Sequence, residues 1–163
     1  MSKKIPYEEG DLFAVPLSGG YAIGVIARCP PVGRILYGYF FGPRRSGVPR
    51  VGDAHGLRPQ DAVAVKPFGD LKLLNNAWPV IGKIEPWRRA DWPMRCFVRT
   101  DSISGSKYKV EYADDGSNRE IKVSPCTQIE AECLTRDGIA GAGAVESILE
   151  GSLPPASETQ VLQ

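Results

Sequence analysis

Glycine and proline divide this chain into short segments, and their spacing limits what it can fold into. The 163 residues include 18 glycines and 14 prolines. Glycine and proline at such short intervals favour strands of about 4–8 residues joined by tight turns, and they interrupt long helices. The sequence therefore predicts a mostly β (α+β) fold, with a curled antiparallel sheet or small barrel and a C-terminal helix.

Apolar alternation predicts where the first strands lie. Strands are expected at 11–17, 21–29 and 35–42, and Tyr21, Ile23, Val25 and Ala27 recur with the period of two that places side chains on one face. The turn at 18–20 contains two glycines and predicts a hairpin. A long loop rich in Arg, Gly and Pro follows at 43–59, and loops of that length are usually functional or mobile.

The second half predicts more strands and one helix. Strands are expected at 62–68, 78–84 and 94–99, with a brief helical turn after Asp70. A second hairpin, 107–113 with 119–123, surrounds the turn Asp114-Asp115-Gly116. Helical spacing of apolar residues appears only at 142–150. The sequence predicts one domain over 1–153, followed by a frayed tail at 154–163.

Charge and targeting signals narrow the class of protein. The net charge is +1, whereas a protein that binds nucleic acid usually carries a strong basic excess. Residues 1–60 are net basic and residues 136–163 net acidic. No apolar run resembles a signal peptide or a membrane span of about 18 residues. We expect a cytoplasmic protein with reduced thiols at Cys29, Cys96, Cys126 and Cys133.

The residues offer little for catalysis. The single histidine, His55, lies in the Arg-rich loop and is more simply an exposed loop residue than the base of a Cys–His pair. The cysteines and His55 have poor spacing for zinc. Asp114 and Asp115 fit a turn better than an acid pair. The glycines at 138, 141 and 143 lack the lysine of a phosphate loop. The sequence predicts no catalytic residue, no metal and no cofactor, although an enzyme that uses His55 stays open.

One segment predicts binding to a partner. Tryptophan and arginine dominate the hot spots of protein interfaces, and both occur together in the loop at 86–93. The arginines of the 43–59 loop would extend this patch into a basic surface for an acidic partner. The predicted contact residues are Arg44, Arg45, Arg50, Trp87, Arg88, Arg89 and Trp92. The alternative is that the indoles cover the core and the arginines are merely solvated.

Two segments resemble the bacterial polymorphic-toxin immunity family called immunity protein 26. The first is the hairpin that starts Gly-Asp-Leu-Phe-Ala-Val-Pro-Leu at Gly10 and continues as Gly-Tyr-Ala-Ile-Gly-Val from Gly20. The second is Trp-Pro-Val-Ile-Gly, which begins at Trp78. The resemblance covers roughly residues 8–100. The family-motif residues for which we expect a structural role are Gly10, Asp11, Phe13, Pro16, Trp78, Ile81 and Gly82.

The resemblance implies a small, mostly β protein that binds and neutralises a cognate toxin without catalysis. The resemblance does not extend to the Arg-rich loop or to the acidic tail. Charge reversal at Arg88 and Arg89 is predicted to weaken toxin binding. The alternative is a barrel-type module that reads nucleic acid or peptides, because curled sheets with exposed aromatics can stack bases.

Overall fold

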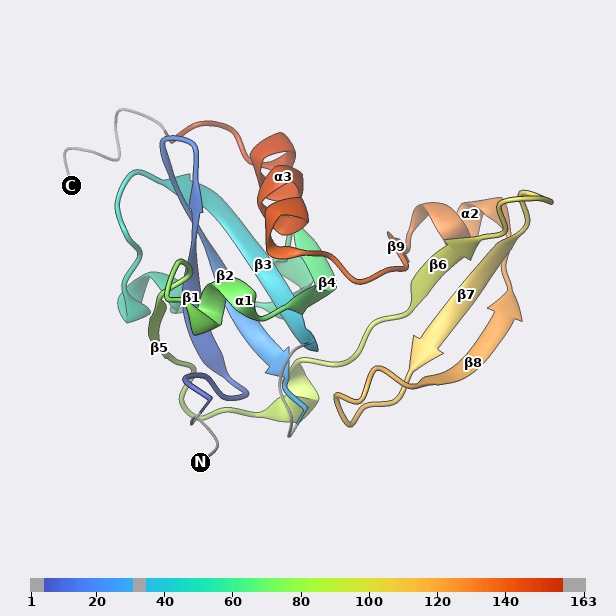
Figure 1. Cartoon of the computed structure of the whole chain (residues 1–163), viewed down its shortest axis with the longest axis horizontal. Helices are drawn as coiled ribbons and strands as arrows, with labels where there is room; N and C mark the ends of the chain where they lie inside the picture. The colour runs from blue at the N-terminus through green and yellow to red at the C-terminus, as the bar shows by residue number, and fades with distance from the viewer. Residues whose placement is uncertain (1–4, 31–34, 157–163) are drawn as a thin grey trace.

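The computed structural model describes residues 5–30 and 35–156, and its strands form two sheets (Figure 1). The larger sheet has five antiparallel strands in the order β4-β3-β2-β1-β5. Its strands are β1 (Asp11–Leu17), β2 (Gly20–Arg28), β3 (Ile35–Arg45), β4 (Ala64–Gly69) and β5 (Val80–Lys83). The first hairpin and the strand that follows it are confirmed.

The smaller sheet follows in sequence and projects from one side of the larger one (Figure 1). Its order is β8-β7-β6-β9, and β9 runs parallel to β6. Its strands are β6 (Phe97–Thr100), β7 (Lys107–Tyr112), β8 (Glu120–Pro125) and β9 (Thr135–Arg136). The predicted hairpin around Asp114 is confirmed as β7 and β8.

Both faces of the larger sheet are buried, because consecutive residues of β1 to β3 are apolar and point to opposite sides. On one face, Phe13, Phe40 and Trp78 pack against Val145 and Leu149 of α3 (Ala142–Ser152). The opposite face is covered by residues that follow β5 and by the smaller sheet. The buried residues of this second core are Leu12, Ile23, Val25, Ala27, Tyr37, Tyr39, Phe41, Val65, Trp92 and Phe97.

The mostly β class and the C-terminal helix are confirmed, and neither sheet closes into a barrel. At one edge of the larger sheet, β4 meets the chain before α3, where Phe68 bridges to Ala140 and the Gly69 N–H donates to the Ala140 carbonyl. The other edge is β5. The edge strands β4 and β5 do not pair with each other, so the sheet stays open.

Some local structure differs from the sequence prediction. The long loop begins later, since β3 continues to Arg45, and it contains two short 3-10 helices, η1 (Val51–Ala54) and η2 (Pro59–Asp61). A further one, η3 (Arg89–Asp91), lies in the Trp/Arg loop. The short helix α1 (Leu71–Leu74) after Asp70 is confirmed, whereas α2 (Gln128–Glu132) was missed. Its signal was a capping box between Thr127 and Glu130.

The two sheets are joined by an ion pair and by aromatic packing. Arg28, at the end of β2, is buried and donates from Nε and Nη2 to one carboxylate oxygen of Asp114 in the β7–β8 turn. Phe97 of β6 meets Tyr37 of β3 edge to face, with 6.1 Å between the ring centroids. On the smaller sheet, Phe97 also contacts Tyr112 at 5.8 Å. Of the predicted tail, residues 157–163 lie outside the described residues.

Candidate functional site

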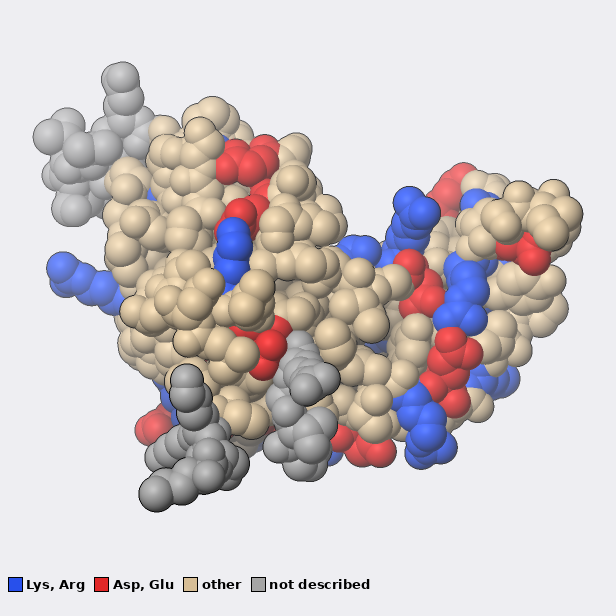
Figure 2. Space-filling model, viewed as in Figure 1, with Lys and Arg blue, Asp and Glu red and all other residues tan. Residues whose placement is uncertain are grey.

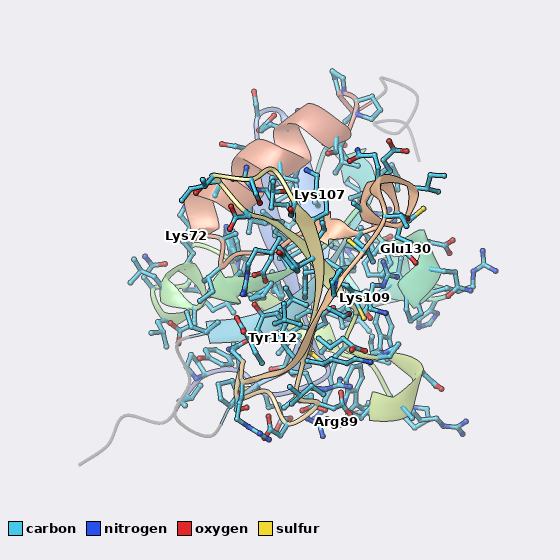
Figure 3. The ribbon with its side chains drawn as sticks, turned by 90° about the vertical axis from the view of Figure 1, so that its right-hand side faces the viewer. Lys72, Arg89, Lys107, Lys109, Tyr112 and Glu130 are labelled. Atoms are coloured by element: carbon cyan, nitrogen blue, oxygen red, sulfur yellow. The ribbon has the colours of Figure 1, made fainter. Side chains whose placement is uncertain are left out.

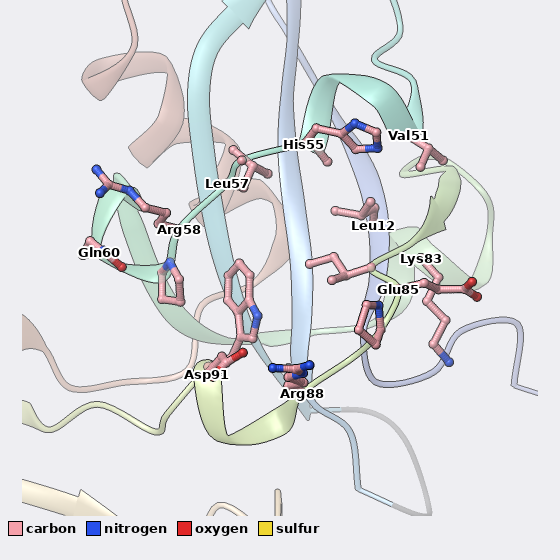
Figure 4. A pocket seen from close by; sticks show the side chains of 16 residues that line it. Leu12, Val51, His55, Leu57, Arg58, Gln60, Lys83, Glu85, Arg88 and Asp91 are labelled. Atoms are coloured by element: carbon pink, nitrogen blue, oxygen red, sulfur yellow. The ribbon is translucent and has the colours of Figure 1, made fainter.

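A groove of about 720 Å³ lies between the loop that carries η1 and η2 and the loop that carries η3 (Figure 4). We call it the loop groove. Its floor is apolar, and its rim is polar and charged. We call floor the larger apolar side chains that line it, which are Leu12, Leu57, Pro59, Ile84, Pro86 and Trp92. The rim consists of His55, Arg58, Gln60, Lys83, Glu85, Arg88 and Asp91. The groove thus unites the two loops that the sequence singled out.

The first wall, which contains η1 and η2, is anchored to the larger sheet. The Val51 side chain lies against the backbone of Gly82 so closely that a Cβ there would meet its Cγ2 at 2.0 Å. Asp53 accepts the Arg50 backbone N–H at 2.8 Å and pairs with Arg45 at 3.4 Å. The contacts with Gly82 and Arg45 attach η1 to the sheet at two points, so the wall is held before any partner arrives.

The second wall is anchored in the same way. The Trp87 indole covers Gly10, where a Cβ would lie 3.0 Å from two of its ring atoms. Glu9 accepts a hydrogen bond from Trp87 Nε1 at 3.1 Å and pairs with Arg89 Nε at 2.9 Å. Trp92 is buried and stacks on Trp87 with a centroid distance of 5.9 Å. The two motif glycines therefore seat the walls of the loop groove.

The structure places the predicted arginines in different environments. Arg44 is buried and does not reach the groove. Its guanidinium donates to the carbonyls of Ser18 and Leu153, both at 2.8 Å, and pairs with Glu150 at 3.0 Å. Arg44 therefore ties the β1–β2 turn to the end of α3. Arg50 and Arg88 are exposed and, among the described residues, form no ion pair.

Most cations around the groove are neutralised within the chain. Arg58 pairs with Asp61 at 2.9 Å, and Lys83 pairs with Glu8 at 2.5 Å. Glu85 and Asp91 on the same rim form no ion pair with any residue that the structure describes. The rim charges left outside ion pairs are therefore two carboxylates and the guanidinium of Arg88.

Basic side chains elsewhere do not extend this rim. Figure 3 shows Lys107 and Lys109 of β7 on the projecting sheet, well separated from Arg89. On the face seen in Figure 2, the same sheet carries side chains of both signs. On that face, the described arginines and lysines do not gather into one basic patch.

The remaining motif residues have structural environments. Trp78 and Phe13 are fully buried and stack at 5.6 Å, and Trp78 Nε1 donates to Glu146 at 2.9 Å. Asp11 is buried and accepts the Glu8 backbone N–H at 2.8 Å, and burial raises the pKa of its carboxyl. Pro16 pairs with Tyr21 in the first hairpin, and Ile81 packs against the second core face.

Catalytic and metal-binding groups are sparse in the described part of the chain. His55 is exposed at the groove rim. Over residues 5–30 and 35–156, no cluster of three or more His, Cys, Asp or Glu side chains has the arrangement of a metal site. Burial raises the pKa of the Cys29 thiol to about 11, with smaller effects from Glu9, Asp70 and Asp11. That thiol is therefore protonated near neutral pH and a poor nucleophile.

Several groove residues were missed by sequence reasoning. Leu57, Ile84, Glu85 and Asp91 line the groove, but only proximity to the predicted loops pointed to them. Leu57 and Ile84 lie about 27 residues apart and meet only because β5 returns beside β1. No local pattern marks such a pair.

Comparison with known proteins agrees with the motifs. The model of the family described as Immunity protein 26 matches residues 8–109, which is more than half of the chain. No curated protein and no solved structure matches. Among the described residues, none of the helices has the length and apolar character needed to cross a membrane. The matched segment contains both glycines that seat the groove walls and both loops that form them, and the chain belongs to the immunity protein 26 family.

Proposed function

We propose that this protein neutralises a bacterial toxin by binding it in a stoichiometric complex, without catalysis, inside the cell that it protects. Membership of an immunity protein family carries this proposal. The loop groove supports it, because an apolar floor within a charged rim resembles the anatomy of protein interfaces. The contacts that hold both walls reduce the entropy lost when a partner binds.

The proposed contact surface consists of the groove together with the exposed predicted residues Arg50, Arg88 and Arg89 and the half-buried Trp87. Arg44, Arg45 and Trp92 belong to its support, because Arg44 and Trp92 are buried and Arg45 pairs with Asp53. A surface built on loops above a rigid sheet can vary in its lining while the scaffold stays constant. That arrangement suits a protein that must match one particular toxin.

Co-expression with a toxin domain encoded by a neighbouring gene tests the proposal. We expect growth to be rescued, and a titration of purified toxin should lose activity linearly until one equivalent of this protein is present. Destruction of the toxin by substoichiometric amounts would show catalysis. Failure to rescue growth, with both proteins folded and expressed, would contradict toxin neutralisation for this pair.

A further inference from the structure

We infer that the loop groove holds a segment of the partner in which a large apolar side chain is flanked by basic side chains. This inference rests on the proposed function for the identity of the partner, but it concerns the chemistry of the occupant. It follows from the size and lining of the groove and from the rim charges that lie outside ion pairs.

The apolar part of the occupant follows from the floor. Leu57, Ile84 and Trp92 come from three separated parts of the chain and together line the groove. A volume of about 720 Å³ accepts a large side chain together with its neighbours. Val51, on the lip, keeps 39% of its surface exposed, so apolar area is available for a partner to cover.

The basic part of the occupant follows from the rim. Arg58 and Lys83 already have carboxylate partners in Asp61 and Glu8. Glu85 and Asp91 form no ion pair among the described residues. Of the arginines and the lysine on the rim, only Arg88 also lacks an ion pair within that part of the chain. Two carboxylates against one guanidinium favour a positively charged segment. Because these ion pairs neutralise Arg58 and Lys83, the number of arginines no longer favours an acidic partner. For Arg88, the expected effect of charge reversal is therefore the opposite of the one that the sequence predicted.

The three tryptophans supply an internal test by nuclear magnetic resonance. Trp92 lies in the groove floor and Trp87 stacks on it, whereas Trp78 lies in the core on the opposite face of the sheet. The ¹⁵N-labelled protein is titrated with the peptide Gly-Lys-Phe-Lys-Gly. We expect the Trp92 indole N–H resonance to shift while that of Trp78 stays in place.

Two control peptides separate the apolar from the charged requirement. Gly-Glu-Phe-Glu-Gly and Gly-Lys-Ser-Lys-Gly should both bind on the order of tenfold more weakly. In the protein, Glu85→Lys with Asp91→Lys should weaken binding of the Lys-Phe-Lys peptide, and Arg88→Glu should strengthen it. An unchanged Trp78 resonance verifies that each variant is folded.

The inference is overturned if the Lys-Phe-Lys peptide leaves Trp92 unshifted, or if either control peptide binds as tightly. It is equally overturned if the two lysine substitutions leave the affinity for that peptide unchanged. Because no toxin is present, failure of this test is distinct from failure of growth rescue. Rescue without peptide binding rejects the occupant, whereas peptide binding without rescue rejects the proposed function.

Discussion

Val51 lies directly over Gly82, with its Cγ2 only 2.0 Å from the position that a Cβ on Gly82 would take. This contact joins η1 to β5 and sets the position of one groove wall. In this chain, a side chain at position 82 would therefore meet Val51 and press against the wall.

The substitution Gly82→Ala should therefore destabilise the fold by about 1–3 kcal/mol through overpacking. Val51→Ala removes the clashing methyl and should restore part of the loss in the double variant. Urea denaturation of the two single variants and the double variant measures the coupling. Strictly additive effects would show that the contact does not position η1.

Arg44 lies near the end of β3 and Arg50 in the loop that follows, and their substitutions should have opposite effects. Arg44→Ala leaves the Ser18 and Leu153 carbonyls and Glu150 without their donor, and we expect a loss of about 3 kcal/mol. Arg50→Ala is the matched control, because its exposed side chain should contribute less than about 0.5 kcal/mol. Chemical denaturation compares them, and equal losses would reject the structural role of Arg44.

The ion pair between Arg28 and Asp114 should hold the projecting sheet in place. Asp114→Ala leaves a buried guanidinium without its carboxylate. Because Asp114 itself is 66% exposed, we expect a loss of about 1–2 kcal/mol, less than for a fully buried pair. Hydrogen exchange should rise in β7 and β8 before it rises in β1 to β3. Asp115→Ala, one residue further along the same turn, is the control and should leave that pattern unchanged.

Cys29 should be the slowest thiol to alkylate. Its pKa of about 11, against an ordinary 9.0, lowers the thiolate fraction near neutral pH about 100-fold. Because the raised pKa favours the protonated form, its rate should climb about tenfold per unit between pH 7 and 9 without a plateau. Iodoacetamide labelling followed by peptide mass spectrometry measures this, and the exposed Cys133 should label first. Labelling of Cys29 at the rate of Cys133 would show that the site opens readily.

The strand pattern could be predicted from the sequence because it depends on neighbouring residues. Alternation in β1 to β3, the Asp-Asp-Gly turn and the helical spacing before the C-terminus are local properties of the chain. The motifs at Gly10 and Trp78 also identified the family, which the family model confirms over residues 8–109. The short helix α2 shows the limit, since its capping box alone marked it within a polar segment.

The charge of the proposed binding surface could not be predicted in the same way. Arg44 finds Glu150 across 106 residues, and Lys83 finds Glu8 across 75 residues. The β class, the motif glycines and the two loops follow from the amino-acid sequence alone, because they depend on local backbone preference and apolar period. The burial of individual arginines, the charges that stay outside ion pairs and the approach of the two loops depend on the fold, because each involves residues that the sheet brings together.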